Sequence, residues 1–261
     1  MLLTERENKF NKIEKKSESS EGEPYIKNGG KSMDYTSEKN NKVYLSGEIV
    51  SPAVYSHEVF GEGFYEFSVS VNRLSGQADV LPVTISERLV QEGGLDVGSH
   101  ITAEGQFRSY NKVIDGKSKL MLTVFIRELL PENSFANPNS IILSGYVCKP
   151  PVYRTTPFNR EIADILIAVN RAYGKSDYIP AIAWGRNARF VKNLSVGEKI
   201  TVSGRIQSRE YQKRISDTEI KVLTAYEVSV SKLAVNDNSL FLEQDADFYA
   251  RRSAGEFETV R

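Results

Sequence analysis

The only tryptophan of the 261-residue chain lies in the stretch DYIPAIAWGR, residues 177–186. Successive side chains of an extended strand point to opposite faces, so Tyr178 and Trp184 share one face of a predicted strand. The opposite face carries the smaller residues Ile179, Ala181 and Ala183. Because the small apolar set suits the inside of a sheet, we expect the two large rings to face outward.

A second stretch, ITVSGRIQSREY, alternates in the same way and adds positive charge. One of its faces carries Arg205, Gln207, Arg209 and Tyr211. Aromatic faces stack on unpaired bases, and basic side chains neutralise phosphates. Together the two stretches predict a surface for single-stranded nucleic acid. Arg171 and Tyr173, in the loop before the aromatic strand, are further candidates.

Each candidate also has an ordinary structural interpretation. Trp184 and Tyr178 can instead pack under a loop or in a protein interface, where tryptophan is also favoured. Arg205 and Arg209 can form a solvated strand face, and Arg171 can reach a neighbouring subunit in place of a phosphate. The residues alone leave these alternatives open.

Residues for enzyme chemistry are sparse. Both histidines, His57 and His100, lie in the first half, and neither has His, Cys or carboxylate neighbours at a spacing that suits a metal. The chain contains no GxxxxGK phosphate loop and no GxSxG nucleophile elbow. We therefore expect a protein without enzyme activity, catalytic residues, metal or cofactor.

The cellular compartment is indicated by what the sequence lacks. Cys148 is the single cysteine, which excludes an internal disulfide and fits a reducing compartment. No apolar run approaches the roughly 18 residues of a membrane span, and the first residues lack the apolar core of a secretory signal. These features predict a cytoplasmic protein that does not enter a membrane.

The elements that position the candidates belong to one of two copies of a unit. The triplet LSG at 45–47 recurs at 143–145, and VNR at 71–73 recurs at 169–171. Asp79 recurs as Asp177 at the same offset of 98 residues. After one insertion the offset becomes 99, as in the pairs Gly105 with Gly204 and Ser109 with Ser208. A register held over so many positions indicates a duplication.

The second copy shows the pattern of a small barrel. Gly145 and Gly204 lie inside predicted strands, where glycine marks a bulge or a sharp coil. Five short strands with one helix between the third and fourth predict an OB-fold, a five-stranded Greek-key barrel. The expected class is therefore all-β, with two tandem OB-folds. The strands are predicted near 141–149, 161–170, 177–184, 199–209 and 219–231, and the helix over 185–191.

Charge distinguishes the two barrels although the chain as a whole has 34 basic and 34 acidic residues. Residues 41–138 carry 8 basic and 12 acidic residues, whereas residues 139–235 carry 15 and 8. The first copy also has Val80 and Ser86 where the second has Tyr178 and Trp184. We expect the second barrel to bind nucleic acid and the first to be degenerate. The expected domains are a disordered arm (1–40), the first barrel (41–132), the second barrel (139–235) and a flexible tail (236–261).

The sequence from Val169 to Tyr211 resembles the bacterial single-stranded DNA-binding protein family. In that family the third strand begins with an aromatic residue and ends with another before a Gly-Lys or Gly-Arg pair. Here these positions are Tyr178, Trp184 and Gly185-Arg186. The fourth strand then runs from Gly204 through polar and basic residues to an aromatic, Tyr211. The resemblance is strong over 141–233 and weaker, through the repeat, over 43–130.

The resemblance implies a protein of DNA replication, recombination and repair that binds single-stranded DNA by stacking and phosphate contacts, with little sequence preference. It implies Arg186 as a further contact, a nucleoid-associated location, and a homodimer that brings four barrels together. The chain ends in GEFETVR, unlike the acidic Pro-Phe tip through which family members recruit replication and repair proteins. Two alternatives stay open: an OB-fold module that assembles a replication or conjugation complex, and an RNA-binding OB protein.

Overall fold

Each copy of the duplicated unit folds into a closed barrel of five strands with one additional short strand at its outer edge. The structure is a computed structural model, and it describes residues 40–90, 94–114, 116–132, 137–214 and 220–236. The first barrel contains β1 (Asn41–Ile49), β2 (Val54–Val59), β3 (Glu62–Asn72), β4 (Ala78–Ser86), α2 (Glu87–Val90), β5 (His100–Ile114) and β6 (Lys117–Leu129). The second contains β7 (Asn139–Val147), β8 (Val152–Thr155), β9 (Glu161–Asn170), η2 (Ala172–Gly174), β10 (Ser176–Trp184), α3 (Arg186–Val191), β11 (Lys199–Arg214) and β12 (Ile220–Val235).

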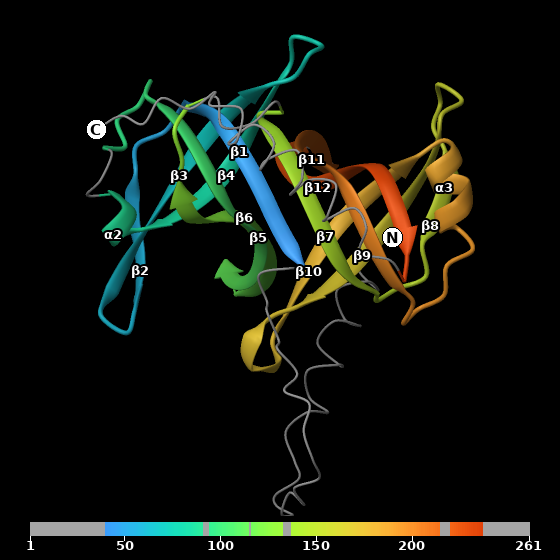
Figure 1. The fold of residues 1–261 in the computed structure, drawn as a ribbon. Helices are drawn as coiled ribbons and strands as arrows, with labels where there is room; N and C mark the ends of the chain where they lie inside the picture. Colours follow the sequence, from blue (N-terminus) through green and yellow to red (C-terminus); the bar gives the residue numbers. More distant parts are fainter. Residues whose placement is uncertain (1–39, 91–93, 115, 133–136, 215–219, 237–261) are drawn as a thin grey trace, which may run out of the picture. The chain divides into compact units, whose positions relative to one another are not determined.

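The strand pairing closes each barrel in the order of an OB-fold (Figure 1). In the second barrel β7 pairs with β9 and β11, and β12 pairs with β11. The ring closes where β10 runs parallel to β12, with Ala181 opposite Val228. The first barrel closes at the equivalent place, with Val83 opposite Val124. The prediction of two tandem OB-folds is confirmed.

The predicted strands and helix of the second barrel are confirmed with shifted ends, and one strand was missed. β8 is only four residues long and forms the outer edge of the sheet, paired with β9. Three of its four residues are exposed, so it lacks the alternation that marks a half-buried strand. The predicted arm (1–40) and tail (236–261) lie outside the described residues, apart from residues 40 and 236.

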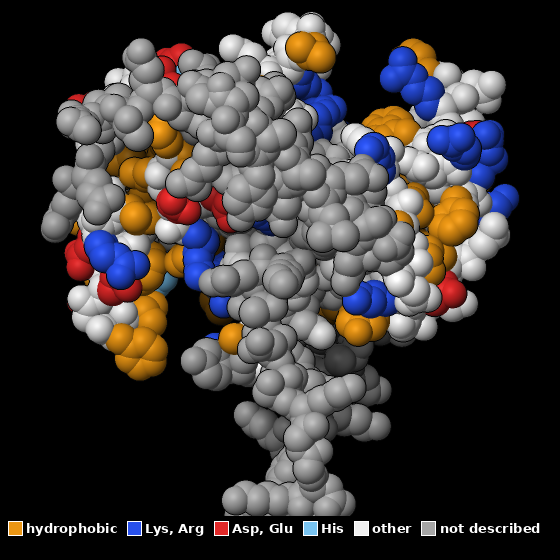
Figure 2. Space-filling view, in the orientation of Figure 1, with side chains coloured by type: hydrophobic (Ala, Val, Ile, Leu, Met, Phe, Trp, Pro, Cys, Tyr) orange, Lys and Arg blue, Asp and Glu red, His pale blue; other side chains and the backbone are white. Residues whose placement is uncertain are grey.

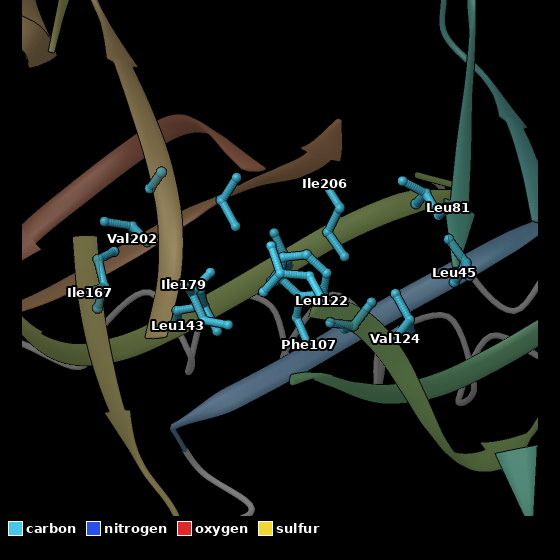
Figure 3. Close-up of a cluster of buried hydrophobic side chains, with 14 of the residues drawn as sticks. Leu45, Leu81, Phe107, Leu122, Val124, Leu143, Ile167, Ile179, Val202 and Ile206 are labelled. Atoms are coloured by element: carbon cyan, nitrogen blue, oxygen red, sulfur yellow. The ribbon is translucent and has the colours of Figure 1, made fainter. Parts of the chain in front are cut away.

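The core forms because one face of each strand is apolar. Ile179, Ala181 and Ala183 are 0%, 2% and 0% exposed, which confirms that they line the barrel. One cluster of buried side chains includes residues of both copies. Figure 3 shows Leu45 and Leu81 from the first barrel, Leu143 and Ile179 from the second, and Phe107 between them.

Pairing of β1 with β7 joins the barrels into a single twelve-stranded sheet. Both barrels belong to one compact unit. Asn41 and Asn139, on the two strands of this junction, each bond to the fourth strand of their own barrel. The Asn41 side chain donates to the Phe107 carbonyl (2.8 Å) and accepts from its N–H (2.9 Å), and Asn139 makes the same pair of bonds with Ile206 (2.7 and 2.9 Å). The duplication therefore extends to side-chain contacts within each barrel.

Glycine is required where strands bend sharply. The pairing of β11 with β12 shifts register between Ser203 and Gly204, which confirms the predicted irregularity. A Cβ on Gly204 would lie 2.0 Å from the Ser229 carbonyl oxygen. Gly145 shows instead a close approach of two strands, because its Cβ would lie 2.4 Å from the Ala168 carbonyl oxygen. Among the described residues, no helix is long and apolar enough to span a membrane.

Candidate nucleic-acid interface

Trp184 ends β10 with its ring on the outer face of the barrel. It is 37% exposed, and Tyr178 at the start of the same strand is 40% exposed, so both rings face outward as predicted. The register of β10 against β12 places Ile182 opposite Ser229. The Trp184 indole N–H consequently donates to Ser229 Oγ at 3.2 Å. This bond orients the ring while leaving part of it accessible.

The outer face of β11 is only partly accessible. Arg209 and Tyr211 are exposed, whereas Gln207 is 6% exposed and donates to Glu227 Oε1 at 2.8 Å. Arg209 Nε also donates to Glu227, at 3.4 Å. Glu227 thus holds the Gln207 side chain in place and orients the Arg209 side chain through its Nε. Gln207 is positioned to support this surface rather than to project from it.

A groove of about 1010 Å³ brings part of the predicted set together with residues of the first barrel. From the second barrel its lining includes Trp184, Arg205, Gln207 and Arg209, together with Arg160, Ser208, Glu210, Thr224, Tyr226 and Ser229. From the first barrel it includes Arg73, Gln77, Ala78 and Val80. Four arginines and one glutamate give this lining a net positive charge. We call it the Trp184 groove.

A buried carboxylate connects the two sides of the Trp184 groove. Asp79 is 0% exposed and accepts hydrogen bonds from Arg73, from Arg205 Nη1 (3.0 Å) and from the Ser208 N–H (2.8 Å). Burial alone would raise the pKa of Asp79, but the bonds from Arg73 and Ser208 and the charges of both arginines hold it below its ordinary value. Two cations therefore share one anion, which leaves a net positive charge at the junction.

The remaining predicted residues lie outside the lining of the Trp184 groove. Tyr211 is exposed further along β11, and Arg186 is exposed at the start of α3. Arg171 lies at the other junction, where its Nη1 is 3.3 Å from Asp177 Oδ1. Tyr178 also lies at that junction, since its N–H donates to Ser109 Oγ of the first barrel at 2.8 Å. The backbone of Tyr173 lies in η2, and its side chain is outside the described part of the structure.

The predicted set leaves out several residues of this groove, among them Arg73, Arg160 and Tyr226. Arg73 carried a signal, because it repeats as Arg171 in the recurring VNR triplet. Tyr226 lies on a predicted strand, but nothing local indicated that its ring lines a groove. Arg160 follows the β8 strand that the pattern did not show.

Basic side chains also gather beside the groove on the second barrel. Figure 2 shows Lys and Arg side chains over the region of β8 and α3. Arg154, Arg186 and Arg189 are exposed on these two elements. Arg154 pairs with Asp164 at 3.0 Å and Arg189 pairs with Glu161, so part of this charge is balanced locally.

Comparison with known proteins shows what the second barrel is similar to. The model of the Single-strand binding protein family matches residues 138–235. Residues 138–235 are therefore similar to the single-strand binding protein family. The chain is 37% identical over 93 residues to single-stranded DNA-binding protein 1 of Staphylococcus aureus, and 34% identical over 83 residues to the single-stranded DNA-binding protein of Clostridium tetani.

The similarity in sequence covers a smaller part of the chain than the similarity in fold. The two matches cover 31% and 29% of this chain and 56% and 57% of those proteins, so the chain spans little more than half of the relatives' length. The wild-type single-stranded DNA binding protein from Thermus aquaticus has a TM-score of 0.57 at 20% identity, over 76% of this chain and 93% of its own. That likeness extends over both barrels and shows a shared fold.

Proposed function

We propose that the chain binds single-stranded DNA without strong sequence preference and acts, without enzyme activity of its own, in DNA replication, recombination and repair. The observation that carries this proposal is the Trp184 groove, which places a partly exposed indole among four arginines. A base stacked on Trp184 gains about 1–3 kcal/mol, and every base offers a flat face. The family of residues 138–235 supports the same ligand.

The arginines supply the contacts to the backbone of the strand. Arg209 is exposed beside the indole, and Arg160 lines the same groove from the β8–β9 connection. Each phosphate contact on a single strand lowers log K by about 0.7 for each log unit of salt. The basic second barrel carries most of the affinity in this proposal. Arg186, Arg171, Tyr211 and Tyr173 then extend the contact surface beyond the groove.

Assembly and location belong to the same proposal. Two chains would provide four barrels, so we propose that the protein is a homodimer. We propose that it lies in the cytoplasm, associated with the nucleoid, and that replication or repair proteins are its partners. Sedimentation of the purified chain at micromolar concentration tests the dimer. A monomer that binds DNA with full affinity would contradict it.

A second candidate function is an assembly module for a replication or conjugation complex. The observation that favours it is β2, whose six residues are all exposed and include Val54 and Tyr55. Phe60, at the adjacent turn, is also fully exposed. An exposed apolar edge strand offers a surface to another protein.

The single tryptophan provides the deciding experiment. The chain is titrated with oligo-dT while Trp184 fluorescence is followed at low and high salt, with duplex DNA and an RNA oligomer of matched length as controls. Quenching by the single strand that weakens with salt and is absent with duplex supports the proposal. Stronger quenching by RNA favours an RNA-binding protein. No quenching by any oligomer favours the assembly module.

A further inference from the structure

Two arginines of the Trp184 groove are bound to one carboxylate, Asp79 on β4 of the first barrel. Arg73 donates to Asp79 Oδ2 from Nε at 2.7 Å and to Oδ1 from Nη2. Arg205, on β11 of the second barrel, donates to the same carboxylate from Nη1 at 3.0 Å. Both arginines line the groove, and their side chains are 22% and 35% exposed. The groove therefore contains an anion of its own beside its cations.

Asp79 occupies the donors with which an arginine binds phosphate. A guanidinium presents its N–H groups as a planar fork that fits two oxygens of either a carboxylate or a phosphate. Arg73 offers such a fork, formed by Nε and Nη2, to Asp79. The nitrogens that remain are directed to amide oxygens: Arg73 Nη1 to Gln77 at 3.4 Å and Arg205 Nη2 to Gln207 at 3.3 Å. A phosphate in the groove would have to compete with Asp79 for the Arg73 fork.

The Asp79 carboxylate is a fixed part of the fold. Its side chain is fully buried and also accepts a hydrogen bond from the Ser208 N–H at 2.8 Å. Burial raises the pKa of Asp79, but the bonds from Arg73 and Ser208 and the two arginine charges lower it overall, so the group is ionised at neutral pH. The bond with Asp79 raises the pKa of Arg73 in turn. The anion is therefore present before any DNA arrives.

Two further arginines in the described lining of the groove are placed differently. Arg160 is exposed, and the Arg209 side chain is 52% exposed. Arg209 Nε lies 3.4 Å from Glu227 Oε1, which is long for a charge-assisted hydrogen bond. A phosphate can meet these two cations without first displacing a buried carboxylate.

The duplication supplies a matched junction in which the carboxylate holds fewer cations. At the first junction Asp79 accepts from the Ser208 N–H, and at the second Asp177, 98 positions later, accepts from the Ser109 N–H at 2.7 Å. Asp177 forms its ion pair with Arg171, at 3.3 Å. The bridging of two arginines by one carboxylate is thus seen at the junction that borders the Trp184 groove.

We infer that Asp79 limits the affinity of the Trp184 groove for single-stranded DNA by keeping Arg73 and Arg205 from its phosphates. This inference rests on the proposed function of the groove. The three side chains together carry one net positive charge, and without the carboxylate they would carry two. The first barrel thereby sets how strongly the second barrel holds a strand.

Asp79→Asn should therefore bind single-stranded DNA more tightly than the wild type. With oligo-dT of about 6 nucleotides, which one OB-fold can hold, the affinity at low salt should rise about tenfold, the effect of one added charge-assisted hydrogen bond. The slope of log K against log salt should become steeper by about 0.7 for each arginine that gains a phosphate. Anisotropy of the labelled oligomer measures both quantities. Damage to the structure would lower the affinity, so the direction of the change separates the two effects.

Glu128→Gln is the control for charge, because it removes one exposed carboxylate of the first barrel outside the groove lining. It should leave the affinity and the salt slope unchanged. An increase equal to that of Asp79→Asn would show that only the net charge of the chain matters, and the inference would be wrong.

Arg73→Gln tests the same contact while Asp79 keeps Arg205 as its partner. Alone it should leave the salt slope nearly unchanged, because Asp79 already holds Arg73, whereas Arg209→Gln should reduce the slope by about 0.7. Added to Asp79→Asn, it should remove about 0.7 of the gained slope. This comparison decides the matter even if Asp79→Asn does not fold: equal reductions by Arg73→Gln and Arg209→Gln would overturn the inference.

The outcomes separate this inference from the proposed function. If the wild type binds the oligomer and a folded Asp79→Asn protein, verified by its melting curve, binds it equally or more weakly, only the inference is wrong. If neither protein binds any oligomer, the proposed function is wrong and the inference falls with it.

Discussion

At the residue scale, Trp184 combines one fixed edge with one accessible face. Its N–H is bonded to Ser229 Oγ, which limits rotation of the ring before any ligand arrives. A side chain that is already oriented loses less conformational entropy when a base stacks on it. This property distinguishes Trp184 from Phe60 and Phe158, which are exposed at equivalent turns of the two barrels.

Replacing Trp184 by alanine should weaken binding of short oligo-dT by about 1–3 kcal/mol, the value of one stacked base. Trp184→Phe should recover part of the loss, because it restores a flat ring without the indole N–H. Anisotropy of a labelled oligomer measures both variants without relying on tryptophan emission. Phe60→Ala is the control, since it removes an exposed ring outside the groove. An equal loss in the control would contradict a specific role for Trp184.

Gly204, in β11, allows the backbones of β11 and β12 to approach each other closely beside Ser229, the partner of Trp184. Because its Cβ would lie 2.0 Å from the Ser229 carbonyl oxygen, Gly204→Ala should destabilise the fold by about 1–3 kcal/mol or more. Chemical denaturation measures the free energy of unfolding. Ser231→Ala, at an exposed position of the same β12 strand, should change it by less than about 0.5 kcal/mol. A stable Gly204→Ala protein would show that β12 can move away.

At the element scale, the two junctions share a backbone pattern but differ in how their carboxylates are satisfied. Asp79 has two arginines, whereas Asp177 Oδ2 is buried without a hydrogen-bond partner among the described residues. The cause is an exchange on the fourth strand: Arg205 and Gln207 in β11 correspond to Gln106 and Arg108 in β5. Arg205 reaches Asp79, while Arg108 turns over Phe125.

Asp79→Asn should therefore cost more stability than Asp177→Asn at neutral pH. Removing the Asp79 charge leaves two partly buried arginines without their anion, and breaking a buried pair costs about 3–5 kcal/mol. Burial raises the pKa of Asp177, and the Ser109 N–H and the Arg171 charge offset this rise only in part. The ionised form of Asp177 is therefore less favourable in the folded protein than in the unfolded chain. The free energies of unfolding of the two variants check this order. Equal losses would contradict it.

The same carboxylates predict opposite pH effects. The pKa of Asp79 is lowered in the fold, so its stabilisation is present above the ordinary value of 3.8 and is lost as pH falls through the lowered value. The pKa of Asp177 is raised, so its contribution is complete below 3.8 and is lost as pH rises through the raised value. In a plot of the free energy of unfolding against pH, Asp79→Asn should reduce the loss of stability below pH 3.8. Asp177→Asn should reduce the loss of stability as pH rises above 3.8.

At the scale of the whole molecule, the groove exists only because the barrels are joined. Its lining takes residues from β4 and β11, whose chain positions differ by more than 100 residues. The β1–β7 pairing and the bonds of Asp79 to Arg205 and Ser208 hold these parts together. The net charge of zero for the chain therefore conceals a local positive region.

The salt dependence of binding should follow this local charge and not the total. Arg209→Gln should reduce the slope of log K against log salt by about 0.7, the loss of one phosphate contact. Lys117→Gln, at an exposed position of the first barrel, is the matched loss of one charge outside the Trp184 groove. For short oligomers it should leave the slope unchanged. Equal reductions in the two variants would show that binding follows the net charge of the chain.

Local patterns in the sequence determined the duplication, the all-β class, the strand layout of the second barrel and the outward rings of Tyr178 and Trp184. These predictions held because the alternation of a strand has a period of two residues, and a short stretch is enough to show it. The repeat offsets carried each prediction from one copy to the other. Exposure of Arg209 and Tyr211 followed from the same alternation.

Only the tertiary structure decided how those residues combine. Alternation placed Arg205, Gln207 and Arg209 on one face, but contacts with Asp79 and Glu227 bury Gln207 and pair Arg205. It placed Tyr178 on the same face as Trp184, but the Tyr178 N–H contacts Ser109 of the first barrel, whereas Trp184 lines the Trp184 groove. The reason is that side-chain direction is set by local backbone geometry, whereas the partner that a face meets is set by pairing between residues far apart in the chain.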